Sequence, residues 1–84
     1  MSAAVLRLGD KGQAVKALQA ALLERGFNPG LVDGEFGGGT QAAVMAFQRS
    51  EGLLADGIAG PRTQAALGLV DSPELPDVRG QMTV

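Results

Sequence analysis

The sequence contains no cysteine and no histidine among its 84 residues, and these two absences exclude most of the common catalytic chemistries. Without cysteine there is neither a disulfide nor a thiol nucleophile, and without histidine the usual general base near neutral pH is missing. Metal sites built from cysteine and histidine ligands are excluded for the same reason. Nine carboxylates remain, and nothing in the sequence singles out a pair of them, so we do not expect an enzyme.

Tryptophan and tyrosine are also absent, and phenylalanine occurs only three times. Proteins that bind glycans usually stack the sugars on Trp or Tyr rings, so recognition of a glycan by stacking is not expected. Positive charge is scarce as well, because seven Lys and Arg stand against nine Asp and Glu, for a net charge of -2. The basic residues are scattered and form no stripe, which argues against a nucleic acid partner.

Long apolar runs are missing too. No stretch approaches the roughly 18 residues that a membrane-spanning helix needs, so no membrane partner is expected. Residues 1–8 lack the charged start and the long apolar segment of an export signal, which leaves the export route open. A chain of 84 residues without disulfides can form one domain with a single small core.

What the chain does contain is an internal repeat. The segment Asp33–Val44 returns 23 residues later as Asp56–Leu67, and seven of the eleven positions from Asp33 to Ala43 are identical. Each copy begins with Asp-Gly, a dipeptide typical of tight turns, and continues through a glycine into a short run with helical spacing. Two units, each a loop followed by a helix, therefore form the frame of the predicted fold.

The first helix is predicted over about residues 12–25, ahead of the repeat. Asp10 and Gln13 stand at the spacing of a capping box, which favours a helix start at this point. Gly26 is expected to end the helix in a left-handed conformation, with Phe27 folding back onto the last turn.

Two further helices are predicted, from Gly37 or Gly38 to about Glu51 and over about 61–68, where Pro61 suits the first helical position. The fold class is therefore all-α, a small three-helix bundle with structured Asp-Gly loops before helices two and three. The predicted core consists of Val15, Leu18, Leu22, Val44, Phe47, Leu53, Ile58 and Leu67. Residues 1–7 are expected to form a loosely specified lead, residues 8–70 the domain, and residues 71–84 a proline-containing tail or linker.

Glycines crowd the first loop and suggest a phosphate-binding loop, but the lysine that such a loop requires before Thr40 is absent. We favour an interpretation in which Gly34 takes a positive φ in a turn and Gly37 lets the loop pack tightly on the helix start. The Asp-Gly turns also lack the alternating oxygen ligands of a calcium site, and Asp33 and Asp56 are expected to cap backbone N–H groups. No metal and no cofactor are predicted.

Two glutamines directly follow predicted core residues in the shared patterns Val15-x-x-Leu18-Gln19 and Val44-x-x-Phe47-Gln48. A half-buried amide at such a position either links the helix to loop backbone or contacts a ligand. The structural role is slightly favoured.

The ordered set of these motifs resembles the peptidoglycan-binding domain type 1 family over about residues 8–69. The resemblance rests on Leu8-Gly9-Asp10-Lys11-Gly12, Val15-x-x-Leu18-Gln19, Gly26-Phe27, Asp33-Gly34-x-Phe36-Gly37-x-x-Thr40, Val44-x-x-Phe47-Gln48, Gly52-Leu53 and Asp56-Gly57-Ile58-x-Gly60-Pro61-x-Thr63. It implies a non-catalytic module that tethers a bacterial or phage cell-wall enzyme to murein in the cell envelope. Gly38-Gly39 departs from the pattern, because such domains often carry larger polar residues there.

The resemblance implies peptidoglycan as the partner, and the lack of Trp and Tyr favours its stem peptides over its glycan. Stem peptides carry carboxylates, and the N-terminus of a helix attracts anions. Helix two is the better candidate, because Pro61 removes a donor from helix three. The predicted ligand-binding residues are Asp33, Gly34, Phe36, Gly37, Gly38, Gly39, Thr40, Gln48, Asp56, Gly57, Ile58 and Gly60. The tail is a candidate joint to a catalytic domain or partner protein, and the alternative function is a protein–protein interaction module of the same fold.

Overall fold

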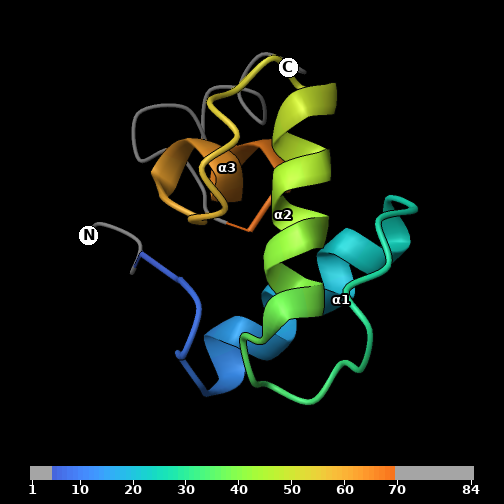
Figure 1. Cartoon of the computed structure of the whole chain (residues 1–84), viewed down its shortest axis with the longest axis vertical. Coiled ribbons are helices and arrows are strands. Elements are labelled where there is room, and N and C mark those ends of the chain that lie inside the picture. The colour runs from blue at the N-terminus through green and yellow to red at the C-terminus, as the bar shows by residue number, and fades with distance from the viewer. Residues whose placement is uncertain (1–4, 70–84) are drawn as a thin grey trace, which may run out of the picture.

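The computed structural model describes residues 5–69, and within them it shows an all-α fold (Figure 1). Helix α1 spans Gln13–Glu24, α2 spans Gly38–Ser50 and α3 spans Pro61–Ala66. In Figure 1 the long α2 (green) stands upright, with α3 (orange) beside its upper half and α1 (blue to cyan) crossing behind its lower half. The predicted all-α class and three-helix arrangement are confirmed, while the predicted tail at 71–84 lies outside the described residues. None of the helices within 5–69 has the length and apolarity needed to cross a membrane.

The predicted end of α1 is confirmed. Gly26 has a φ of 89°, and the Phe27 N–H donates to the Leu22 carbonyl oxygen at 2.8 Å. This bond, which closes back over the last turn, satisfies a carbonyl that the helix itself leaves without a donor. It also turns Phe27 inward, where its ring meets Phe47 edge-on with centroids 5.6 Å apart. The turn that ends α1 thereby joins α1 to α2.

The predicted capping box at the start of α1 is wrong. Gly12 is the N-cap residue, with no side-chain cap, and the Asp10 carboxylate accepts the backbone N–H of Arg7 at 2.9 Å instead. Backbone pairing explains the difference: the Asp10 carbonyl accepts the Phe36 N–H, and the Gly12 N–H donates to the Gly34 carbonyl, both at 2.9 Å. These bonds to the first loop place Asp10 outside the helix, too far back to cap it.

The core lies where the three helices meet the two loops. The predicted core residues that are buried are Val15, Leu18, Leu22, Val44, Phe47 and Leu67. Leu53 and Ile58 were also predicted in the core, but they are only partly buried. Both follow the end of α2 and line a pocket described below, so the prediction was wrong in placing them inside the bundle.

Residues 5–12 cross both loops of the repeat and tie them together. Leu6 and Ala59 exchange two backbone hydrogen bonds of 3.1 and 2.8 Å, and the Gly9 N–H donates to the Phe36 carbonyl at 2.9 Å. Phe36 and Ala59 occupy the same position in the two copies of the repeat, and both are buried, as is Leu6. The sequence assigned Leu6 to a loosely specified lead, because one leucine in a short segment carries no periodic signal. The structure makes it part of the core.

Replacing the most buried aromatic ring tests this arrangement. Phe47 is 1% exposed and packs against Phe27, so we expect Phe47→Ala to lower the free energy of unfolding by about 3–5 kcal/mol. Leu31→Ala is the control, because Leu31 is 76% exposed and its truncation should change that free energy by less than about 0.5 kcal/mol. Urea unfolding followed by circular dichroism measures both. A Phe47→Ala protein as stable as the parent would contradict the described core.

Candidate functional site

The first loop is held by one buried side chain, Gln19, which is 0% exposed. Its Nε2 donates to the Glu35 carbonyl at 2.8 Å, to the Thr40 hydroxyl at 2.9 Å and to the Asp33 carboxylate at 3.3 Å. Its Oε1 accepts the Gly34 N–H at 2.8 Å. An amide nitrogen has two hydrogens, so three acceptors require one of them to be shared. One side chain of α1 therefore fixes both the loop and the first turn of α2.

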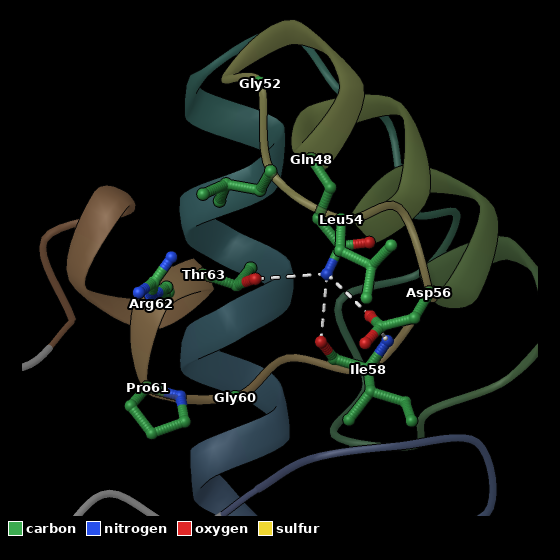
Figure 2. Close-up of a pocket in the computed structure, with 10 residues that line it drawn as sticks. Gln48, Gly52, Leu54, Asp56, Ile58, Gly60, Pro61, Arg62 and Thr63 are labelled. Carbon is green, nitrogen blue, oxygen red and sulfur yellow. Dashed lines mark hydrogen bonds between the residues drawn. The ribbon is translucent and has the colours of Figure 1, made fainter.

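Gln48 repeats this arrangement in the second loop (Figure 2). Its Nε2 donates to the Ile58 carbonyl at 2.9 Å and to the Thr63 hydroxyl and the Asp56 carboxylate, both at 3.1 Å. Its Oε1 accepts the Gly57 N–H at 3.0 Å. Gln48 is 1% exposed, so both glutamines are more deeply buried than predicted, and both have the structural role that the sequence favoured.

The two repeated aspartates cap loop backbone, as predicted. Asp33 accepts the Glu35 N–H at 3.0 Å and Asp56 accepts the Ile58 N–H at 2.9 Å. The backbone N–H of Glu35, followed by the Gln19 amide, lowers the pKa of the Asp33 carboxyl below its ordinary value. The backbone N–H of Ile58 does the same for the pKa of Asp56, with a smaller contribution from Gln48. Both side chains are exposed, so their charge stays solvated while their geometry is fixed.

Glycine is required after each aspartate. Gly34 and Gly57 are buried and have φ values of +81° and +76°, which confirms the positive φ predicted at Gly34. Gly37 was predicted to allow close packing at the start of α2, and this is wrong, because nothing lies within 4 Å of where its Cβ would stand. The close approach is at Gly39, where a Cβ would lie 2.7 Å from the carbonyl oxygen of Pro29.

A pocket of about 380 Å³ opens between the second loop and α3, and we call it the α3 pocket. Figure 2 shows Pro61 and Arg62 on its α3 side and Leu54 and Ile58 on the side of the loop. Leu54 is 80% exposed, so an apolar side chain stands open to solvent at the pocket. The lining residues are Gln48, Gly52, Leu53, Leu54, Asp56, Ile58, Gly60, Pro61, Arg62 and Thr63.

A second hollow, of about 390 Å³, lies between the start of α1 and the first loop, and we call it the α1 pocket. Two lysines and two carboxylates are among its lining residues, so their charges balance. The residues are Lys11, Gly12, Gln13, Lys16, Asp33, Gly34 and Glu35. Within residues 5–69 no three carboxylates come together in a way that could hold a metal ion.

The predicted ligand-binding residues fall into four groups. Gln48, Asp56, Ile58 and Gly60 line the α3 pocket, whereas Asp33 and Gly34 line the α1 pocket. Phe36, Thr40 and Gly57 are buried in the fold, and Gly37, Gly38 and Gly39 are exposed at the start of α2, outside both pockets.

Sequence reasoning missed Leu53, Leu54 and Arg62 as pocket residues. A signal was present in the pair Leu53-Leu54 after Gly52, because a helix stop that needs one apolar residue here has two. Arg62 carried no signal of its own, since a lone arginine after the first residue of a helix is ordinary surface composition.

Residues 11–67, more than half of the chain, match the family described as "Putative peptidoglycan binding domain". The chain belongs to this family. It is 51% identical over 61 residues to N-acetylmuramoyl-L-alanine amidase CwlM of Mycobacterium tuberculosis, covering 73% of this chain and 15% of that protein. It is 44% identical over 63 residues to the spore cortex-lytic enzyme of Bacillus cereus, covering 75% of this chain and 24% of that enzyme. The chain thus spans less than a quarter of the length of either relative.

The fold is similar to that of a solved structure of comparable size. The crystal structure of the SleB N-terminal domain superposes with a TM-score of 0.76 at 43% identity, covering 81% of this chain and 93% of that one. The three-helix arrangement is therefore that of the family.

The lowered pKa values predict how stability depends on pH. The ordinary pKa of both aspartates is 3.8, and the folded state lowers it, so their carboxylates stabilise the fold above that pH. This contribution is lost as the pH falls through the lower, folded-state pKa. We expect the urea midpoint to drop between about pH 4 and pH 2, and to drop less in the double variant Asp33→Asn, Asp56→Asn. Glu24→Gln, at the exposed end of α1, is the control that should keep the parent's acid sensitivity. An equally steep acid transition in the double variant would contradict the assigned role.

Proposed function

We propose that this chain binds peptidoglycan as a non-catalytic module and that the α3 pocket is where the ligand sits. The observation that carries the proposal is the pairing of family membership with a pocket whose walls include the exposed Leu54. A single exposed leucine is ordinary on a protein surface, but Leu54 adjoins the partly buried Leu53 and Ile58, and contiguous apolar surface is typical of contact sites. Together the three offer an apolar surface that a ligand can cover.

The lining chemistry favours the peptide part of peptidoglycan over its glycan. Leu53, Leu54, Ile58 and Pro61 suit small apolar groups such as methyl side chains, while none of the lining residues is an aromatic ring for stacking a sugar. Arg62 supplies a guanidinium that can pair with a carboxylate of a stem peptide. The N-terminus of α2 at Gly37, Gly38, Gly39 and Thr40, which the sequence favoured as the anion site, is the alternative to this pocket.

The wider role follows from the relatives. CwlM and the spore cortex-lytic enzyme bear the names of cell-wall amidases and lytic enzymes, and this chain matches a small part of each. We infer that the module holds a catalytic part, attached or associated, against murein in the cell envelope. The module itself should release no soluble fragments from labelled peptidoglycan, because it has neither cysteine nor histidine. Sustained release by the purified chain would contradict the non-catalytic assignment.

Pelleting with purified sacculi tests the binding function and its location. The parent protein at tens of micromolar should be retained in the pellet, which is an ordinary weak-affinity regime. Leu54→Ser and Arg62→Glu should each lower retention several-fold, because they remove the apolar contact and the carboxylate partner. Lys16→Glu is the matched control, since it changes the net charge as Arg62→Glu does but lies in the α1 pocket. Leu31→Ser is the control for an exposed leucine elsewhere.

Each other outcome has a defined meaning. Loss of retention in Lys16→Glu alone would place the site at the α1 pocket. A further variant, Gly38→Asp, tests the start of α2, and loss of retention in this variant alone would place the site there. Equal loss in every charge variant, reversed by added salt, would indicate long-range repulsion rather than a pocket. A parent protein that stays in the supernatant would contradict peptidoglycan binding and favour a protein–protein interaction module.

A further inference from the structure

The two copies of the repeat differ in the length of chain that leads into them. Between the glutamine and the aspartate that it binds there are 14 residue steps in the first copy, from Gln19 to Asp33, and 8 in the second, from Gln48 to Asp56. Part of the excess lengthens the helix, and part lengthens the loop, which has six residues (27–32) after Gly26 but three (53–55) after Gly52. The hydrogen bonds that the glutamine makes to the loop and to the following threonine, which we call the clamp, are the same in both copies. The added loop residues therefore precede the clamp.

The longer loop of the first copy contacts the first turn of α2 at Gly39. Pro29 is buried, and its carbonyl oxygen lies 2.7 Å from where a Cβ on Gly39 would stand. Asn28 and Gly30 close a turn around it, because the Gly30 N–H donates to the Asn28 side chain at 2.8 Å. Loop residues 28–30 thus sit against Gly39.

Gly39 corresponds in the repeat to Arg62, which lines the α3 pocket. The correspondence follows from the identical Asp-Gly starts and from the shared bonds of Gln19 to Thr40 and of Gln48 to Thr63. The place that residues 28–30 fill in the first copy is therefore left open in the second, where the shorter loop does not reach.

We propose that the α3 pocket takes a short peptide in the place that residues 28–30 hold in the first repeat, so that this loop is an internal analogue of the ligand. The inference rests on the proposed function and adds to it how the peptide lies in the pocket, namely with its backbone over the first turn of α3. Peptide fits because in the first copy a peptide carbonyl, that of Pro29, lies against the corresponding first turn of α2.

Because of Arg62, we expect the ligand to lie at a different distance from its helix than residues 28–30 do from theirs. Gly39 permits a backbone carbonyl at a distance that no Cβ tolerates, whereas a residue with a side chain keeps an occupant at ordinary van der Waals distance, 3.4–4 Å. The ligand therefore lies further out than Pro29, within reach of the Arg62 guanidinium. A carboxylate on the peptide would pair with that group and strengthen binding.

A titration followed by amide NMR tests the inference directly. The probes are a capped synthetic peptide that copies residues 27–31, the same peptide with a free C-terminal carboxylate, and a chitin oligosaccharide without peptide. Both peptides should shift the amide signals of Leu54, Ile58 and Arg62 in a saturable way at millimolar concentration. The free carboxylate should bind several-fold more tightly than the capped form, and Arg62→Gln should remove that difference.

A second experiment blocks the α3 pocket by grafting the longer loop of the first copy into the second copy. The graft would replace residues 53–55 by a copy of residues 27–32. It would be combined with Arg62→Gly, so that the grafted loop can approach α3 as residues 28–30 approach α2 at Gly39. The peptides should then cause no shift at Ile58, while a control with a six-residue Gly/Ser loop and the same Arg62→Gly should still respond. If the graft does not fold, the parent titration decides alone.

Two results would overturn the inference. One is a parent protein whose pocket signals respond to the oligosaccharide but to neither peptide, and the other is a peptide response confined to the α1 pocket. Retention on sacculi separates these from a failure of the proposed function, because a chain that pellets with sacculi while ignoring the peptides binds peptidoglycan in some other way.

Discussion

The two loops of this small fold, and the helix starts that follow them, depend on two buried glutamine amides. Gln19 and Gln48 each satisfy a loop N–H, a loop carbonyl and a threonine hydroxyl on the following helix. A buried amide without hydrogen-bond partners costs free energy, and the loop groups that it binds would cost free energy too if they lost it. These hydrogen bonds are therefore expected to form together. Loops rich in glycine, which would otherwise have much conformational freedom, become rigid because one helix side chain fixes both of their ends.

This constraint explains how a repeat can supply both structure and a site. The clamp fixes the path from Asp to Thr in each copy and leaves the preceding loop free to vary in length. The longer loop, residues 27–32, places Pro29 against the first turn of α2 and packs Phe27 against the core. A short loop at 53–55 leaves the other copy open and exposes Leu54 beside Arg62. The copy with the shorter loop is thus the one that has the α3 pocket beside its helix.

The sequence predicted the features that depend on residues close together in the chain. The stop at Gly26-Phe27, the inward face of α1 and the capping aspartates depend on residues a few positions apart, and their periodicity or turn chemistry is visible in one pass. The pairing of Leu6 with Ala59 depends on residues 53 positions apart, and an isolated leucine gives no sign of it. Asp10 failed as a cap for the same reason, since a distant loop binds its backbone.

The candidate site was only partly predictable. The loop from Asp56 to Gly60 was identified from its motif, but the motif could not show that Pro29 lies against Gly39, the counterpart of Arg62, in the first copy. Leu53 carries the same apolar signal as a core residue, and only the shape of the loop shows that it lies at a pocket wall instead.

The most direct test of the account is hydrogen exchange at the amides of Gly34 and Gly57, which donate to the two buried glutamines. Both glycines lie in loops, where amides ordinarily exchange fast through local opening. If the clamps hold the loops as described, both amides will exchange as slowly as those in the middle of α2, and Gln48→Ala will speed exchange at Gly57 far more than at Gly34. Exchange at Gly57 in the parent as fast as at an exposed loop residue such as Leu31 would contradict the account.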